Sequence, residues 1–162
     1  MTRLHQISPS NPPDLVPLTR WFRDLEQAAG RGGIFARAAD TARLLVATPS
    51  DETVLHGDIH HGNILDFGDR GWLAIDPKGL LGERGFDYAN LLCNPDPQTA
   101  ADPARFRTRL SHVAAAAGLD RQRLARWVLA WVALSILWPP FEPKRTEAVR
   151  RLSELAAAEI DQ

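Results

Sequence analysis

Residues 54–67, VLHGDIHHGNILDF, place three histidines, two aspartates and an asparagine between two short apolar runs. The apolar runs are of the β type, and a third one follows at Trp72–Ile75. Between the last two runs lies the turn-forming sequence Gly68-Asp69-Arg70-Gly71. The pattern predicts one antiparallel hairpin, with the crowded polar motif at its entrance.

The register of that hairpin decides which polar side chains meet. If it is symmetric about a four-residue turn, Phe67 pairs with Trp72 and Asn63 lies directly opposite Asp76. Directly opposed residues have Cβ atoms about 4.5 to 5.5 Å apart. Amide and carboxylate oxygens at that separation suit Mg²⁺, which keeps several waters and takes further ligands from phosphates. Asp58, in the loop entering the same end, is placed to accept a proton from an attacking hydroxyl.

Helical periodicity and capping signals account for most of the remaining chain. Asp102, followed by a proline, and Asp120 are predicted N-caps. The tryptophans between residues 127 and 138 recur at helical spacing, which favours a core face over a stacking platform. We therefore expect an α+β domain that is mainly helical with a small antiparallel hairpin. The predicted helices span residues 18–30, 34–46, 103–118, 121–138 and 142–160.

Composition narrows the choice of partners. The 162 residues carry a formal net charge of -1, which gives no electrostatic footprint for nucleic acid or for an anionic membrane. The most apolar stretch, residues 127–138, is shorter than the roughly 20 residues that span a bilayer. Cys93 is the only cysteine, which fits a reducing compartment. We expect a cytoplasmic protein with no nucleic-acid or membrane partner.

The run HGDIHHGN at residues 56–63, followed by Ile75-Asp76, resembles the catalytic loop and metal-binding aspartate of kinases in the aminoglycoside phosphotransferase superfamily. These enzymes form a branch of the protein-kinase-like fold. The wider stretch over residues 56–96 is similar to the streptomycin phosphotransferase group, also described as an aminoglycoside/hydroxyurea antibiotic resistance kinase family. The likeness continues more weakly to the C-terminus.

This resemblance implies a role for each of five residues. Asp58 is the catalytic base, and His56 orders the loop. Asn63 and Asp76 are magnesium ligands. Asp87, in the sequence GFDYANL, matches a buried aspartate that braces the catalytic loop from a following helix. The implied reaction is transfer of a phosphate from ATP, with Mg²⁺, to an alcohol group of a streptomycin-like aminoglycoside.

Other parts of such a kinase do not occur in the sequence. The family also uses a glycine-rich strand-turn-strand and a strand lysine that pairs the nucleotide phosphates. The only lysines are Lys78 and Lys144, and both follow the catalytic loop. The GRGG run at residues 30–33 follows a helical pattern and is predicted to be a turn between helices. We therefore expect the C-terminal lobe alone, without an N-terminal lobe.

The expected organisation is a Pro-rich lead-in over residues 1–13 and a kinase-like C-terminal lobe over residues 14–162. Within that lobe the helical subdomain covers residues 86–160. A truncated chain of this kind should bind ATP weakly and be weakly active or inactive. A separately encoded N-terminal lobe is a candidate partner.

Several assignments stay open at this stage. Lys78, two residues after Asp76, can either reach a phosphate of the nucleotide or remain solvated. Glu83, Asp96 and Glu142 are candidates for holding the cationic substrate, although Glu83 can equally form a surface ion pair with Arg84.

Two other functions compete with the kinase. One is a non-catalytic module, derived from the C-terminal lobe, that binds a small molecule or pairs with another lobe. The other is a zinc-dependent hydrolase built on His56, Asp58, His60 and His61, which ranks last because adjacent histidines in an extended segment point to opposite faces.

Overall fold

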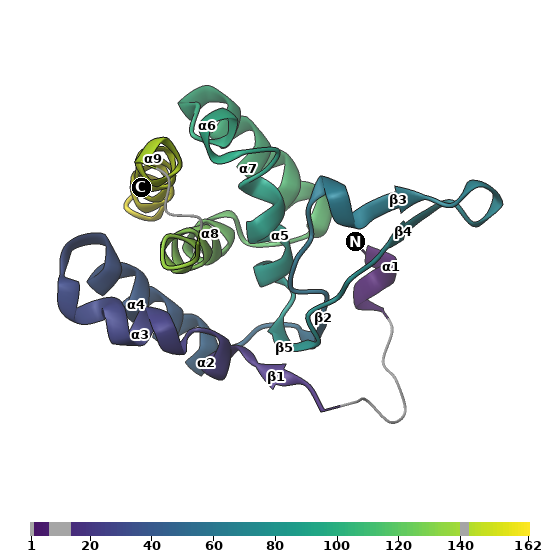
Figure 1. Ribbon diagram of the computed structural model, residues 1–162, viewed down its shortest axis with the longest axis horizontal. Helices are drawn as coiled ribbons and strands as arrows, with labels where there is room; N and C mark the ends of the chain where they lie inside the picture. The colour runs from purple at the N-terminus through teal and green to yellow at the C-terminus, as the bar shows by residue number, and fades with distance from the viewer. Residues whose placement is uncertain (1, 7–13, 140–142) are drawn as a thin grey trace.

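The computed structural model describes residues 2–6, 14–139 and 143–162 (Figure 1). Its strands are short and its helices carry most of the ordered chain, which is the α+β arrangement that the sequence predicts. The strands are β1 (Val16–Pro17), β2 (Glu52–Leu55), β3 (Ile64–Asp66), β4 (Trp72–Ala74) and β5 (Leu80–Glu83). The helices are α1 (Thr2–His5), α2 (Leu18–Trp21), α3 (Arg23–Ala28), α4 (Gly33–Ala47), α5 (Gly85–Leu92), α6 (Pro97–Ala100), α7 (Pro103–Ala117), α8 (Arg121–Ser135) and α9 (Pro143–Ile160).

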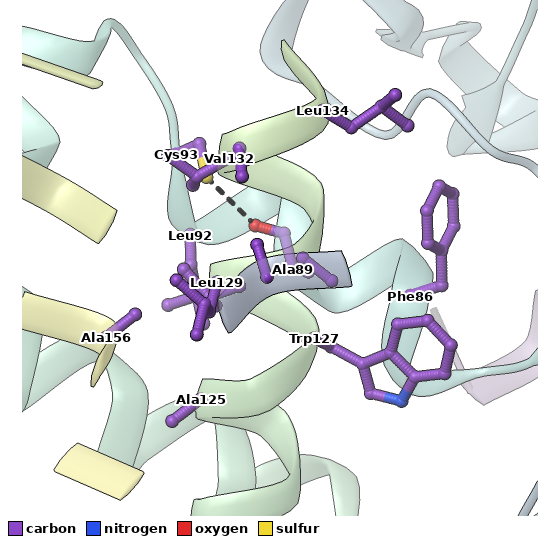
Figure 2. Packing of buried hydrophobic residues seen from close by; sticks show 14 of the residues in the cluster. Phe86, Ala89, Leu92, Cys93, Ala125, Trp127, Leu129, Val132, Leu134 and Ala156 are labelled. Carbon is purple, nitrogen blue, oxygen red and sulfur yellow. Dashed lines mark hydrogen bonds between the residues drawn. The ribbon is translucent and has the colours of Figure 1, made fainter. Parts of the chain in front are cut away.

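Helix α8 lies at the centre of the core and packs against α4, α5 and α9. It begins after Asp120, whose carboxylate accepts a hydrogen bond from the backbone N–H of Arg123 at 2.7 Å. Nearly every apolar side chain of α8 is buried, so the helix has little solvent-facing surface. Figure 2 shows the contact with α5, where the rings of Phe86 and Trp127 meet edge to face with centroids 5.9 Å apart.

The same contact requires a glycine at the start of α5. A Cβ atom on Gly85 would lie 2.6 Å from Cδ1 of Trp127, closer than atoms can approach. The absence of a side chain at this position therefore lets α5 lie directly against α8.

A buried ion pair ties β5 to α8. Glu83 is 3% exposed, and its carboxylate accepts hydrogen bonds from Arg123 at 2.6 to 3.0 Å and from Nε1 of Trp127 at 2.8 Å. The backbone N–H of Ser50 donates a further bond at 3.0 Å. The Glu83 carboxylate raises the pKa of Arg123. The sequence predicts Glu83 at the surface, either as a substrate contact or in an ion pair with Arg84. That prediction is wrong, because donors from Ser50, Arg123 and Trp127 enclose the Glu83 carboxylate.

Most of the predicted helices are confirmed, with changes at their ends. Helix α7 begins after Asp102, whose side chain accepts from the backbone N–H of Arg105 at 2.7 Å, and it ends at Gly118 in the left-handed conformation. Helix α8 stops at Ser135 instead of Trp138. The helix predicted over residues 18–30 divides at Phe22 into α2 and α3.

The strands form two sheets, whereas the sequence predicted one. In the three-stranded sheet β5 lies between β1 and β2, parallel to β1 and antiparallel to β2. Strands β3 and β4 form the predicted hairpin, which projects from one side of the molecule in Figure 1.

The hairpin register differs from the prediction by one residue. Asp66 pairs with Trp72 and Ile64 with Ala74. The turn contains the five residues 67–71, because a 3-10 turn at Gly68–Arg70 is closed by a hydrogen bond from the backbone N–H of Phe67 to the carbonyl of Gly71 at 3.0 Å. Consequently Asn63 lies opposite Ile75 instead of Asp76, and the backbone N–H of Ile75 donates to the Asn63 carbonyl at 2.9 Å.

The first part of the expected lead-in has structure of its own. Helix α1 lies beside β2, where Oγ1 of Thr53 donates to the backbone carbonyl of His5 at 3.4 Å. The Pro-rich residues 7–13 lie outside the described part of the chain. In the ranges that the structure covers, no helix is both long enough and apolar enough to cross a membrane.

The pair of Glu83 and Arg123 should contribute strongly to stability. Removing one partner of a buried ion pair costs about 3–5 kcal/mol, because the other charge is left without compensation. We expect Glu83→Ala to lower the free energy of unfolding by about that amount, measured by urea denaturation. Glu26→Ala is the control, because Glu26 pairs with Arg43 in solvent and its loss should cost less than about 1 kcal/mol. Equal losses in the two variants would contradict the structural role of Glu83.

Candidate active site

The loop that follows β2 is anchored by Asp87 in the first turn of α5. Asp87 is fully buried, and its two carboxylate oxygens accept hydrogen bonds from the backbone N–H groups of His56 at 3.0 Å and Gly57 at 2.7 Å. Nε2 of His5 lies 2.9 Å from the same carboxylate. Gly57 has φ +83°, and a Cβ atom there would lie 2.8 Å from Leu80, so the turn requires glycine. The loop therefore starts in a fixed direction.

His56 joins the loop to the end of the hairpin. Its Nε2 donates to the carbonyl of Ile75 at 2.8 Å, and its Nδ1 accepts from the backbone N–H of Asp58 at 3.2 Å. The ring is buried and both of its nitrogens are engaged. This position suits an ordering role, and it leaves neither nitrogen for a zinc ion.

Asp58 lies beyond the turn and receives donors from several directions. Nδ2 of Asn90 donates to its Oδ1 at 3.1 Å, and Nδ2 of Asn63 lies 3.5 Å from its Oδ2. Asn63 bonds more closely to the backbone carbonyl of Asp58, at 3.0 Å. Nζ of Lys78 is 3.4 Å and Nε2 of His60 is 3.7 Å from Oδ2. The carboxylate is therefore surrounded by nitrogen donors from four side chains.

Lys78 contacts both Asp58 and Asp76. Asp76 has φ +57°, and its exposed carboxylate accepts a hydrogen bond from Nζ of Lys78 at 2.9 Å. The ammonium group lowers the pKa of Asp76, and this carboxylate in turn raises the pKa of Lys78, with a smaller contribution from Asp58. One cation thus bridges the two carboxylates.

These contacts test whether the residues fit a metal ion. Asp58 and Asp76 already share one positive charge, and Asn63 adds an amide group beside them. Carboxylate and amide oxygens are the ligands that Mg²⁺ prefers, together with water and phosphate oxygens. Among the residues described here, no three His, Cys, Asp or Glu side chains form a group that could hold a metal ion. The oxygen atom types suit a hard divalent cation, whereas in this structure the ammonium group of Lys78 binds both carboxylates and the Asn63 amide nitrogen faces Asp58.

A cavity of about 540 Å³ opens beside these residues. Asp58, Lys78 and Asn90 contribute to its wall, together with Trp21, Trp131 and Trp138. Trp138 contacts Trp21 and Trp131 edge to face, with ring centroids 5.9 and 6.4 Å apart. Of the tryptophans predicted to be core, Trp127 is buried, whereas Trp131 and Trp138 are only partly buried and face the cavity. Helical spacing could not distinguish these cases, because a cavity wall and a core face have the same periodicity.

Of the other predicted substrate contacts, Asp96 and Glu83 are not part of this cavity wall. Asp96 caps α6, where its carboxylate accepts from the backbone N–H and Oγ1 of Thr99, both at 2.8 Å. These bonds lower the pKa of Asp96. Glu83 belongs to the buried ion pair, and Glu142 lies outside the described residues. The sequence reasoning missed Asn90, although it is three residues after Asp87 and so falls on the same face of α5.

The link between Lys78 and Asp76 makes a pH-dependent prediction. Because Lys78 lowers the pKa of Asp76, the neutral substitution Lys78→Gln should raise that pKa toward its ordinary value. In the parent protein Asp76 should therefore stay ionised to lower pH than in the variant. Titration of the carboxyl ¹³C resonance by NMR measures both values.

Lys144→Gln is the matched control, because Lys144 is the other lysine of the chain and has no hydrogen bond to Asp76. It should leave the titration of Asp76 unchanged. An Asp76 pKa that is the same in Lys78→Gln and in the parent would show that the contact does not persist in solution.

Comparison with known proteins gives a consistent set of matches. The sequence model described as aminoglycoside/hydroxyurea antibiotic resistance kinase matches residues 1–140. Streptomycin 3''-kinase of Klebsiella pneumoniae is 52% identical over 141 residues, which are 84% of this chain and 53% of that protein. Hydroxyurea phosphotransferase of Kitasatospora aureofaciens is 33% identical over 132 residues, covering 82% of this chain and 36% of that protein.

Streptomycin 6-kinase of Streptomyces glaucescens is 38% identical over 97 residues, covering 58% of this chain and 31% of that protein. The chain thus spans about half the length of the first of these relatives and about a third of the other two. No solved structure matches it. The family model covers most of the sequence, including the whole loop around Asp58, and the chain belongs to the aminoglycoside/hydroxyurea antibiotic resistance kinase family.

Proposed function

We propose that this chain carries the catalytic loop of a phosphotransferase that moves the γ-phosphate of ATP to an alcohol group of a streptomycin-like aminoglycoside. The observation that carries the proposal is the placement of Asp58. Its carboxylate lies on the wall of the cavity and within 3.4 Å of the lysine that also binds Asp76. In this proposal Asp58, the base, and Asp76, the carboxylate that holds a cation, contact the same lysine at the cavity that the acceptor enters.

Each residue has a distinct part in the proposed reaction. Asp58 accepts the proton of the acceptor hydroxyl while the hydroxyl oxygen forms a bond to the γ-phosphorus. The bond from that phosphorus to the bridging oxygen breaks, and ADP leaves with that oxygen. Asn63 and Asp76 would hold Mg²⁺, which neutralises phosphate charge when it is bound with ATP. Lys78 lies between Asp58 and Asp76, where its ammonium group can reach the transferred phosphate.

The acceptor class is supported by the relatives and by the cavity. Two of the relatives are named as streptomycin kinases, and one of them has the highest identity of the three. A cavity of about 540 Å³ is in the range of roughly 300–1,000 Å³ typical of drug-sized ligands. It suits a molecule of several rings better than a compact one such as hydroxyurea. The single cysteine supports a cytoplasmic location, where ATP is also present.

We also propose that the chain corresponds to a kinase C-terminal lobe and transfers phosphate only weakly by itself. No lysine precedes the catalytic loop, so the sequence offers none in the position that pairs the nucleotide phosphates. A further segment, in the same or another polypeptide, would have to cover the nucleotide. The same observation favours a second candidate function, in which the chain only binds the small molecule or pairs with another lobe.

A chimera tests the proposal. The chain replaces the matching segment of the Klebsiella pneumoniae streptomycin 3''-kinase, and ADP release is measured with and without streptomycin. We expect streptomycin-dependent transfer, and we expect Asp58→Asn to lower kcat by about 10²- to 10⁴-fold, the usual contribution of a positioned base. The unmodified chain should show little transfer under the same conditions.

Asp66→Asn is the control, because Asp66 lies on the hairpin and its side chain only accepts from the backbone N–H of Gly68 at 3.0 Å. It should leave kcat unchanged. A folded chimera that binds streptomycin without consuming ATP would favour the binding-module alternative. An Asp58→Asn chimera as active as its parent would refute the assignment of the base.

A further inference from the structure

Asn90 occupies a position that the proposed roles do not use. It is 3% exposed, lies in α5 three residues after Asp87, and is part of the cavity wall. Its Nδ2 donates to Oδ1 of Asp58 at 3.1 Å. Its own Oδ1 lies 3.4 Å from Nδ2 of Asn94, which also donates to the Asn90 backbone carbonyl at 2.9 Å. The amide is therefore held by packing and by Asn94, two residues after the end of α5.

The contact makes the two oxygens of Asp58 different. Oδ1 receives the buried amide of Asn90, in a direction fixed by α5. Oδ2 faces Lys78, His60 and Asn63. Because one oxygen is already paired with a neutral donor inside the protein, the other is left to interact with charged groups and with an incoming ligand.

The other donors cannot orient the carboxylate as well. Asn63 bonds chiefly to the Asp58 backbone carbonyl, so it fixes the main chain. Nζ of Lys78 is closer to Asp76 than to Asp58, at 2.9 against 3.4 Å. Nε2 of His60, at 3.7 Å, is beyond hydrogen-bond distance. Within the described ranges, Asn90 makes the shortest contact to this carboxylate.

We propose that Asn90 is a positioning residue that fixes the side-chain rotamer of Asp58 and directs Oδ2 into the cavity as the proton-accepting oxygen. In this arrangement α5 holds the loop at two points, with Asp87 bound to its backbone and Asn90 bound to its working carboxylate. The claim that Asn90 fixes the rotamer of Asp58 depends only on the contacts in the structure. The claim that Oδ2 accepts the proton rests on the proposed function.

The rotamer part is tested on the chain itself. Three-bond couplings from the backbone nitrogen and carbonyl carbon to Cγ of Asp58 report its χ1 angle in labelled protein. We expect one rotamer in the parent and averaged couplings in Asn90→Leu, which keeps a similar volume but lacks the donor. Asn90→Ser, which keeps a shorter donor, should give intermediate values.

Ser135→Ala is the matched control, because Ser135 is buried and lines the same cavity, and its hydroxyl donates to the Val132 carbonyl at 2.8 Å and not to Asp58. Its Asp58 couplings should equal those of the parent. Averaged couplings already in the parent, or parent-like couplings in folded Asn90→Leu, would overturn the proposal. If Asn90→Leu does not fold, Asp58→Ala decides: the Asn90 side-chain amide should then exchange faster with solvent, and an unchanged rate would overturn it.

Kinetics of the chimera separate this inference from the proposed function. Asn90→Leu should lower kcat by up to about 10²-fold, the cost of a misplaced catalytic group, while KM for streptomycin stays near that of the parent. A rise in KM with kcat unchanged would make Asn90 a ligand contact and refute its positioning role. An inactive chimera with averaged couplings in Asn90→Leu would reject the proposed function and leave the orientation of Asp58 by Asn90 established.

Discussion

The candidate site depends on one buried carboxylate. Asp87 receives the backbone N–H groups of His56 and Gly57, and these two bonds define how the chain leaves β2. A buried carboxylate is costly unless donors satisfy it, so the loop and α5 stabilise each other only in this arrangement. His56 in turn binds the carbonyl of Ile75 and so fixes the end of the hairpin relative to the loop. The positions of Asp58 and Asp76 follow from these contacts.

The core supplies a rigid base for that carboxylate. Helix α5 lies directly on α8, because Gly85 has no side chain and the ring of Phe86 packs against Trp127. The same tryptophan binds Glu83, which ends β5 just before α5. The core and the candidate site are thus connected through one short stretch of chain, residues 83–90. Changes in the core should therefore alter the position of the loop, which also contacts the core directly through Leu80 and Ile59.

Much of the fold was accessible from local signals. The caps at Asp102 and Asp120 and the apolar periodicity predicted α7 and α8, since these depend on neighbouring residues only. Strands β1 and β5 were missed because they are short and pair across more than sixty residues, Val16 with Leu80, without any local signature. Gly82 further breaks the alternation of β5, and a Cβ atom there would lie 2.4 Å from Leu18.

The candidate site was also predictable only where the signal lies in neighbouring residues. The motif around Asp58 identified the loop because its residue types and spacing are local. The hairpin register was wrong by one residue, since the turn geometry at Gly68–Arg70 is not encoded in apolar alternation. Asn90 was not recognised because a polar residue on a buried helix face has meaning only once its partner is known. Trp131 and Trp138 were predicted to be core because helical spacing does not show whether a residue faces the core or a cavity.

The most direct test of this account is hydrogen exchange at the loop, followed by NMR in the parent and in Asp87→Asn. The substituted amide has one acceptor oxygen, so at least one of the His56 and Gly57 N–H groups loses its partner. We expect faster exchange at these amides with α8 still protected, and no such change in Asp102→Asn, where the altered carboxylate caps α7. Unchanged protection at both loop amides would contradict the claim that Asp87 holds the loop around His56 and Gly57.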